Sequence, residues 1–170
     1  MNEPDTATNP RITLRPATEA DTGLILDFIH QLADYEKMSD EVVADEATLR
    51  ASLFGGRQVA EVILASWDGR PAGFALFFHN FSTFLGRTGI YLEDLFVIPE
   101  LRGKGIGQIL LSHLAHITVE RGGGRFEWSV LDWNVDAIRF YERLGAKAMD
   151  GWTTYRVTGD ALEKLAQGRG

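Results

Sequence analysis

The sequence of 170 residues contains no cysteine, which excludes disulfide bridges, cysteine-ligated metal sites and a thiol nucleophile. It also lacks an excess of positive charge, because 17 Lys and Arg stand against 24 Asp and Glu. The formal net charge of −7 repels phosphate backbones, so we expect no nucleic-acid partner. No apolar run approaches the roughly 20 residues of a membrane-spanning helix, and the N-terminus lacks the apolar core of a signal peptide. We therefore expect a soluble, cytoplasmic protein without a membrane partner.

The composition fits a domain with a core large enough to fold alone, since 45% of the residues are hydrophobic and 24% are charged. Residues 1–10 are polar and show no apolar periodicity, so we expect a flexible N-terminal segment there. Residues 11–170 contain no internal repeat and no linker. They are expected to form a single domain.

Apolar periodicity predicts the element order β-α-α-β-β-β-α-β-α-β. The predicted helices span 24–35, 46–54, 105–120 and 134–144, with a further helical turn or two at 160–167. The predicted strands span 12–15, 59–67, 72–79, 90–98, 126–131 and 152–157. This order is typical of an α/β protein (an α+β mixed sheet covered by helices), with the ligand site at the ends of the parallel strands.

A glycine-rich loop follows the strand at 90–98 and opens the next helix; it reads Arg102-Gly103-Lys104-Gly105-Ile106-Gly107. Backbone N–H groups at such a helix N-terminus can converge on phosphate oxygens, helped by the helix dipole and by Arg102 and Lys104. The loop has neither the Gly-Lys-Ser/Thr of a Walker A motif nor the last glycine of a dinucleotide fingerprint. Taken alone, it fits a plain turn into a helix equally well.

The spacing Arg-x-x-Gly-x-Gly at Arg102, Gly105 and Gly107 resembles the pyrophosphate loop of the GNAT acetyltransferase superfamily. Further segments are similar, in the same order, to its spermidine/spermine (diamine) and thialysine N-acetyltransferase branch: RPAT at 15–18, LADYEKM at 32–38, YLEDLFV at 91–97, DWN at 132–134 and FYERLGA at 140–146. The resemblance implies the GNAT-like acyl-CoA N-acyltransferase fold. It also implies an N-acetyltransferase that moves the acetyl group of acetyl-CoA directly to a primary amine of a small cationic acceptor, within a ternary complex.

Acetyl transfer to an amine requires a base, because an alkyl ammonium with a pKa of about 10.4 is almost fully protonated at neutral pH. Strand alternation predicts that Glu93 and Asp94 face opposite sides of the sheet, Glu93 with Tyr91 and Asp94 with Leu92. The resemblance places Glu93 toward the acceptor as the base, acting directly or through water. A pairing of Glu93 with a buried cation such as Arg143 is the alternative, and for Asp94 a structural role is favoured.

The resemblance also implies roles for residues that bind the two substrates. Tyr141 would protonate the leaving thiolate, or would simply be a half-buried core aromatic. Asn134 would bond the pantetheine arm or cap a helix. The predicted cofactor-binding residues are Leu95, Phe96, Val97, Arg102, Gly103, Lys104, Gly105, Ile106, Gly107, Asn134 and Tyr141. The predicted acceptor-binding residues are Tyr35, Glu36, Glu93, Trp128 and Asp150.

The acceptor itself stays open at this point. Acidic residues around Glu36 would attract a cation or form a solvated surface. Where the polyamine enzymes carry an acid, this chain reads Phe81-Ser82-Thr83-Phe84, so a short diamine or a lysine-like amino acid such as thialysine is as credible as a polyamine. An acetyltransferase of protein amines and a non-catalytic acyl-CoA-binding module are the competing functions, and the presence of Glu93 and Tyr141 argues against the second.

Two further expectations concern metals and assembly. The pair His113-x-x-His116 lacks an acidic third ligand nearby, so we expect no metal. Members of the branch that the chain resembles are dimeric, and a last strand at 152–157 would leave an apolar edge exposed. We therefore expect a homodimer.

Overall fold

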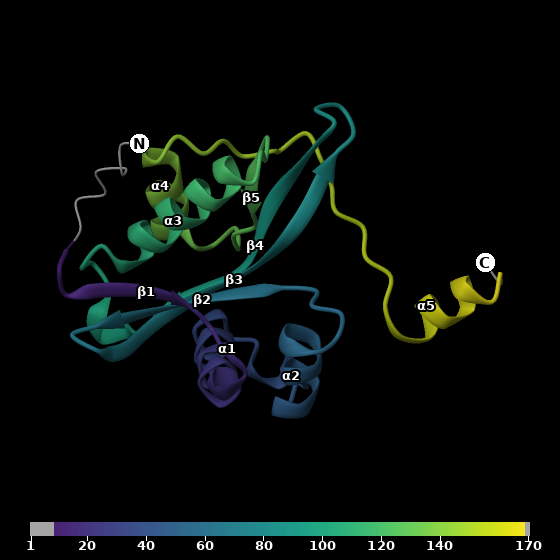
Figure 1. Cartoon of the computed structure of the whole chain (residues 1–170). Coiled ribbons are helices and arrows are strands. Elements are labelled where there is room, and N and C mark those ends of the chain that lie inside the picture. Colours follow the sequence, from purple (N-terminus) through teal and green to yellow (C-terminus); the bar gives the residue numbers. More distant parts are fainter. Residues whose placement is uncertain (1–8, 169–170) are drawn as a thin grey trace. The chain divides into compact units, whose positions relative to one another are not determined.

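The computed structural model describes residues 9–168 (Figure 1). The expected flexible segment at 1–10 therefore lies almost entirely outside the described residues. The contacts divide the chain into two compact units, Met1–Ser129 and Val130–Gly170, and each is described by itself. The expectation of a single domain stays a prediction.

From residue 9 onward, the first unit contains one sheet and three α-helices, with the mixed α/β character that the sequence predicts. Its elements are β1 (Ile12–Pro16), η1 (Glu19–Asp21), α1 (Thr22–Glu36), η2 (Ser39–Glu41), α2 (Glu46–Phe54), β2 (Glu61–Trp67), β3 (Arg70–Ser82), β4 (Arg87–Val97), η3 (Pro99–Leu101), α3 (Ile106–Glu120) and β5 (Phe126–Trp128). The second unit contains α4 (Val135–Arg143) and α5 (Gly159–Ala166).

The sheet has the strand order β1-β2-β3-β4-β5. The first four strands are antiparallel, and β5 pairs with β4 in parallel. Figure 1 shows α1 and α2 on one face of this sheet and α3 on the other. The parallel strands β4 and β5 are connected through α3, and the predicted ligand site falls at this crossover.

An apolar layer holds α1 and α2 on their face of the sheet. Its buried members are Ile25, Phe28, Leu53, Val62, Leu64, Phe74 and Phe96. The Phe28 ring stacks on Phe74 at a centroid distance of 5.6 Å and lies 5.9 Å from Phe96. Burying each such side chain contributes about 1.5–3 kcal/mol, so this layer fixes α1 against β3 and β4.

The end of the chain differs from the prediction. β5 stops at Trp128 rather than at residue 131, and residues 152–157 form no strand within the described chain, where α5 is the next element. The predicted order therefore holds only up to α4. A strand needs a neighbouring row of backbone donors and acceptors, and apolar, β-branched composition alone does not supply one.

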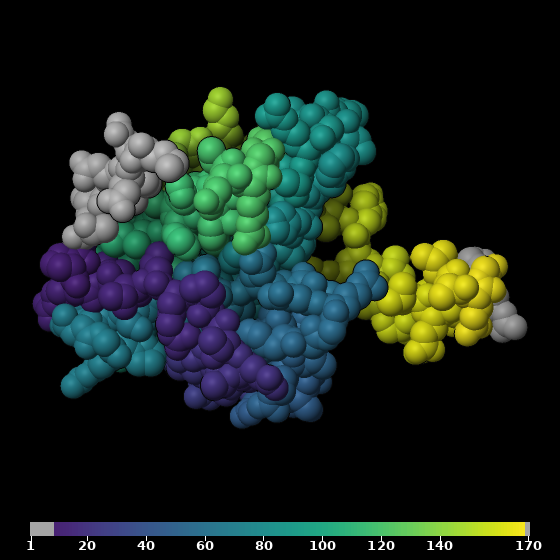
Figure 2. All heavy atoms as spheres, viewed as in Figure 1, coloured from purple at the N-terminus to yellow at the C-terminus, as the bar shows by residue number. Residues whose placement is uncertain are grey.

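The end of β3 and the turn that follows it carry a group of exposed apolar side chains, Phe81, Phe84 and Leu85. Figure 2 shows the teal atoms of this turn at the surface. It contains the segment that stands in place of the acidic loop of the polyamine enzymes. The structure therefore puts aromatic surface where those enzymes are expected to carry negative charge.

Candidate active site

The central feature of the first unit is that β4 runs past the end of β5. The parallel register ends at Leu92 opposite Trp128, whereas β4 continues to Val97. On the other side, the N–H of Ile98 donates to the carbonyl of Ala72, which directs the backbone of Ile98 toward β3. Backbone direction alternates along a strand, so the N–H and C=O groups of Val97 and Leu95 point to the opposite edge. This stretch of edge carries Leu95 and Val97, two of the predicted cofactor-binding residues.

A β-bulge interrupts β4 at the predicted base. Leu76 pairs with Asp94, but the next residue, Phe77, pairs with Leu92, so Glu93 is the extra residue of the bulge. Glu93 is exposed to solvent. Bulges re-aim side chains and are over-represented beside active sites, which suits a residue that must reach a bound substrate.

The bulge overturns the predicted alternation of side chains along β4. Asp94 lies opposite Leu76, which packs on the α1 and α2 layer, whereas Leu92 lies opposite Phe77, which lines a cavity with residues of α3. Leu92 and Asp94 therefore face opposite sides of the sheet, although strict alternation puts them on the same side. The expected placing of Asp94 with Leu92 on one face was wrong, because one extra residue shifts the pattern by one position.

The charge around the bulge is negative. Burial, followed by the neighbouring charges of Glu93 and Glu36, raises the pKa of Asp94 to about 6. Burial also raises the pKa of Glu36, which ends α1. Acidic groups close together beside an open strand edge can attract an ammonium group, and Asp94, with its pKa of about 6, can exchange a proton near neutral pH.

The glycine loop connects η3 to α3 in the way the sequence predicts. Gly105 caps α3 with a φ of 86°, a left-handed conformation that favours glycine. Gly107 is different, because it is the second residue of α3 and a Cβ there would meet no atom within 4 Å. Neither backbone strain nor packing requires a glycine at this position, and glycine inside a helix costs roughly 0.5–1 kcal/mol relative to alanine. Close approach of a ligand to the backbone is a remaining physical reason for a glycine at position 107.

The two cations of the loop lie on aromatic rings. The guanidinium of Arg102 lies 4.5 Å from the centroid of Tyr35, and its Nε donates to the carbonyl of Val97 at 2.9 Å. The ammonium of Lys104 lies 5.1 Å from the centroid of Trp67 on β2. No sequence pattern indicates these two partners, which are distant along the chain.

Several predicted residues lie in the first unit, and the structure brings some of them together. Tyr35 and Glu36 are the last two residues of α1. Tyr35 contacts Arg102, and the negative charge of Glu36 contributes to the raised pKa of Asp94. Trp128 ends β5 opposite Leu92, at the point where β4 runs on alone. These contacts join the loop, the bulge and the end of α1 into one region.

The remaining predicted residues lie in the second unit. Asn134 caps α4, since its side chain accepts a hydrogen bond from the N–H of Ala137 at 3.3 Å. Tyr141 lies on the same helix with its ring 5.5 Å from that of Phe140, and Asp150 is exposed. The capping role of Asn134 is confirmed, and its contact with pantetheine stays a prediction, as do the roles of Tyr141 and Asp150.

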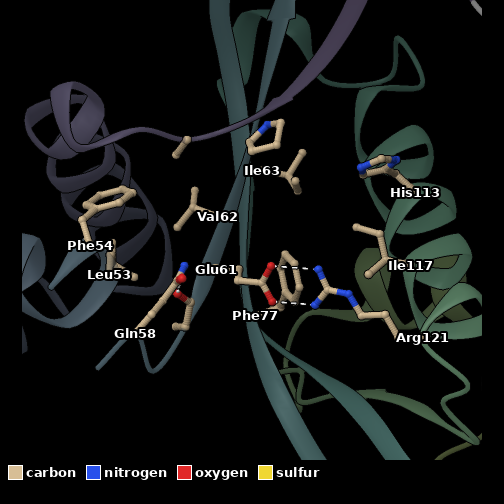
Figure 3. Close-up of a pocket in the computed structure, with 13 residues that line it drawn as sticks. Leu53, Phe54, Gln58, Glu61, Val62, Ile63, Phe77, His113, Ile117 and Arg121 are labelled. Atoms are coloured by element: carbon tan, nitrogen blue, oxygen red, sulfur yellow. Dashed lines mark hydrogen bonds and ion pairs between the residues drawn. The ribbon is translucent and has the colours of Figure 1, made fainter. Parts of the chain in front are cut away.

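A cavity of about 160 Å³ lies elsewhere in the first unit, among α2, β2 and α3 (Figure 3). Glu61 and Arg121 pair across it, with Nη1 and Nη2 of Arg121 donating at 2.6 and 2.9 Å. Arg121 also contacts Nε2 of His79 at 3.2 Å. None of the predicted site residues lines this cavity, so we place the chemistry at the edge of β4 instead.

Between residues 9 and 168, the structure brings no three His, Cys, Asp or Glu side chains together as a group that could hold a metal ion. Within the same described range, every helix is too short or too polar to cross a membrane.

This arrangement of fold and site defines a class of enzyme. Residues 28–146 match the acetyltransferase (GNAT) family, so the chain belongs to this family and is an acetyltransferase. Thialysine N-epsilon-acetyltransferase of Sus scrofa is 39% identical over 166 residues, which covers 91% of this chain and 97% of that protein. L-ornithine N5-acetyltransferase NATA1 of Arabidopsis thaliana is 34% identical over 197 residues, covering 89% and 86%.

A solved structure agrees with this assignment. The integron cassette protein VCH_CASS6 from the mobile metagenome of V. cholerae superposes with a TM-score of 0.77 and 29% identity, over 92% of this chain and 98% of that one. The predicted GNAT-like fold is therefore confirmed, and so is the resemblance to the branch that includes the thialysine enzymes.

Proposed function

We propose that this acetyltransferase moves the acetyl group of acetyl-CoA to the side-chain amine of a small basic amino acid, directly and within a ternary complex. The observation that carries the proposal is the edge of β4 beyond Leu92, which is open toward a cofactor, lined by carboxylates and continued by the glycine loop. These three features supply a binding strand, an amine-attracting charge and an anion cradle in one segment of chain.

The residues present fit coenzyme A. Leu95 and Val97 direct backbone groups to the open edge, so they can pair with the pantetheine amides as a neighbouring strand would. The loop that follows presents N–H groups of Gly103 to Gly107 at the positive end of α3, which suits a pyrophosphate. Bound acetyl-CoA would supply an activated acetyl carbon as its thioester.

Each step of the transfer then has a residue. Glu93 takes one proton from the acceptor ammonium, directly or through water, and frees the nitrogen lone pair. The N–H of Leu95 donates to the thioester oxygen as charge develops there. As the C–N bond forms, the nitrogen would lose its second proton to solvent. As the C–S bond breaks, Tyr141 would give its proton to the leaving thiolate and would regain one from solvent. Asp94 is a second candidate for the base, because its pKa of about 6 suits proton transfer near neutral pH.

The acceptor assignment is supported by both relatives and structure. The two similar enzymes act, by name, on thialysine and L-ornithine, which are amino acids with a primary amine in the side chain. The exposed aromatic turn at Phe81 and Phe84 offers no negative charge for the long chain of a polyamine. Carboxylates are concentrated instead at Glu36, Glu93 and Asp94. One short cationic side chain matches this distribution better than spermidine or spermine does.

A homodimer is part of the proposal. In the second unit, Trp152 and Tyr155 are 79% and 91% exposed on a segment without regular structure. Monomeric proteins seldom present large aromatic residues in an extended, unpaired segment, because such segments associate readily. A second copy of the chain is the partner that we propose for it.

The direct test is release of free thiol from acetyl-CoA with a panel of acceptors. Thialysine, L-ornithine and L-lysine are compared with putrescine, spermidine and a lysine-containing peptide at equal concentrations. We expect the highest kcat/KM with thialysine or L-ornithine, and acetylation at the side-chain amine by mass spectrometry. Preference for the peptide would assign a protein substrate, and thiol release that is independent of every amine would contradict the proposal.

A further inference from the structure

Arg102 joins two parts of the site that bind different substrates. Its Nε donates to the carbonyl of Val97 at 2.9 Å, and its guanidinium lies 4.5 Å from the ring centroid of Tyr35 and 5.6 Å from that of Phe96. Val97 belongs to the strand proposed for pantetheine, and Tyr35 belongs to the end of α1 proposed for the acceptor. The Arg102 side chain therefore contacts one group of each proposed binding site, the Val97 carbonyl and the Tyr35 ring.

The Val97 carbonyl cannot serve both partners in full. It points to the edge of β4 that β5 leaves open, which is where a pantetheine amide N–H would need an acceptor. A cofactor that pairs with this edge competes with Arg102 for the carbonyl oxygen. The displaced guanidinium keeps its positive charge and therefore needs an anionic partner. The pyrophosphate of the cofactor would be that partner, since the loop proposed to bind it, Gly103 to Gly107, begins at the next residue.

The Tyr35 ring shows what the displacement would free. It already binds a cation on its face, which is the geometry in which aromatic rings also bind alkyl ammonium groups. Tyr35 lies beside Glu36, so its face lies next to negative charge as well. While Arg102 occupies this face, its positive charge opposes the approach of a cationic acceptor.

We propose that Arg102 is a positioning residue that couples the two sites: cofactor binding draws its guanidinium from Tyr35 and Val97 to the pyrophosphate, and the acceptor ammonium then takes its place on Tyr35. The inference rests on the proposed function. It requires that coenzyme A strengthen acceptor binding, and by linkage that the acceptor strengthen coenzyme A binding by the same factor.

The test is calorimetric binding of thialysine to the full chain, alone and saturated with coenzyme A, which carries no acetyl group to transfer. In the natural sequence we expect thialysine to bind roughly tenfold tighter in the presence of coenzyme A. In Arg102→Gln, free protein should bind thialysine nearly as tightly as the natural complex does, so that the ratio of the two Kd values falls toward one.

Two matched comparisons separate coupling from damage to the fold. Lys104→Gln removes the other cation of the loop, which lies on Trp67, and should weaken coenzyme A binding while it preserves the ratio. Tyr35→Phe retains an aromatic face and should preserve the ratio, whereas Tyr35→Leu should lower it. The melting temperature of each variant shows that it is folded.

A ratio near one in the natural sequence, or an unchanged ratio in Arg102→Gln, overturns the inference. Either result leaves amine-dependent thiol release intact, and therefore leaves the proposed function standing. Failure of the proposed function is a different observation, namely the absence of thiol release with every acceptor in the panel.

Discussion

Asp94 lies directly opposite Leu76 in the β3–β4 ladder, and so it shares the sheet face that α1 and α2 cover. An acid in this apolar layer is unfavourable in its charged form, which is why burial is the first cause of its raised pKa. The bulge residue Glu93 next to it adds repulsion. A fold that holds two adjacent carboxyl groups at such a position loses stability there, as active sites commonly do.

Asp94→Asn should therefore stabilise the protein at pH 7. Asparagine keeps the shape and removes the charge that burial and the neighbouring carboxylates oppose. From the pKa of about 6, and with allowance for partial exposure, we expect a gain of roughly 1–2 kcal/mol in the free energy of unfolding. Urea unfolding at pH 7 measures it, with Glu93→Gln as the exposed neighbour for comparison.

The gain should depend on pH in a defined direction. The folded state holds the Asp94 proton more tightly than the unfolded state, whose pKa is about 3.9, so stability falls as the pH rises from about 4 to 6. The advantage of Asp94→Asn should be absent below about pH 4 and constant above about pH 6. An equal advantage at pH 3.5 and pH 7 would show that titration of Asp94 is not its cause.

Gly107→Ala should change stability and cofactor binding in opposite directions. A Cβ at Gly107 meets no atom within 4 Å, so alanine should stabilise α3. The gain should be smaller than the roughly 0.5–1 kcal/mol of a helix interior, because Gly107 is the second residue of the helix. The same methyl group would occupy the path of the pyrophosphate, and we expect coenzyme A to bind at least about tenfold more weakly. Calorimetry and thermal unfolding of one preparation measure both effects.

Gln108→Ala is the control for Gly107→Ala. Gln108 is exposed in the same turn of α3, so its replacement should leave the affinity for coenzyme A nearly unchanged. Equal loss of affinity in the two variants, or none in either, would reduce the glycine loop to an ordinary helix entry.

The dimer prediction concerns the segment at 152–157. Light scattering should give a mass near twice the chain mass of 18.9 kDa. Tyr155→Asp places a charge on a residue that is 91% exposed in the single chain, so it should disrupt the dimer without unfolding the monomer. A monomer mass at every concentration would refute the proposed assembly.

Much of the fold could be predicted because local signals agree with tertiary packing. The helix at 46–54 has the predicted bounds, since Asp45 caps its start by accepting from the N–H of Thr48 and the chain turns at Gly55. The segment at 152–157 has strand-like composition but no strand in the described chain, because pairing depends on a neighbour that the sequence pattern does not reveal.

The residue types of the candidate site could be predicted from the sequence better than their arrangement in space. The glycine loop and the acids of β4 stand out in the sequence, because their chemistry depends on residue type and spacing. The bulge at Glu93 could not be predicted from the sequence, because a strand with one extra residue has the same composition as a regular strand. The contacts of Arg102 with Tyr35 and of Lys104 with Trp67 could not be predicted either, because the partners of long side chains depend on which elements the fold brings close to them.

The proposed division of roles between Glu93 and Tyr141 is most directly tested by the pH dependence of kcat/KM for Glu93→Gln. With the best acceptor, we expect a loss of roughly 10²- to 10⁴-fold at pH 7 that narrows toward pH 10, because hydroxide then deprotonates the amine. Tyr141→Phe, which lacks the proton donor, should not recover in alkali. Near-natural kcat/KM for Glu93→Gln at pH 7, with the loss found in Asp94→Asn instead, would move the base to Asp94; a large loss in Glu93→Gln that stays constant from pH 7 to 10 would contradict deprotonation by Glu93.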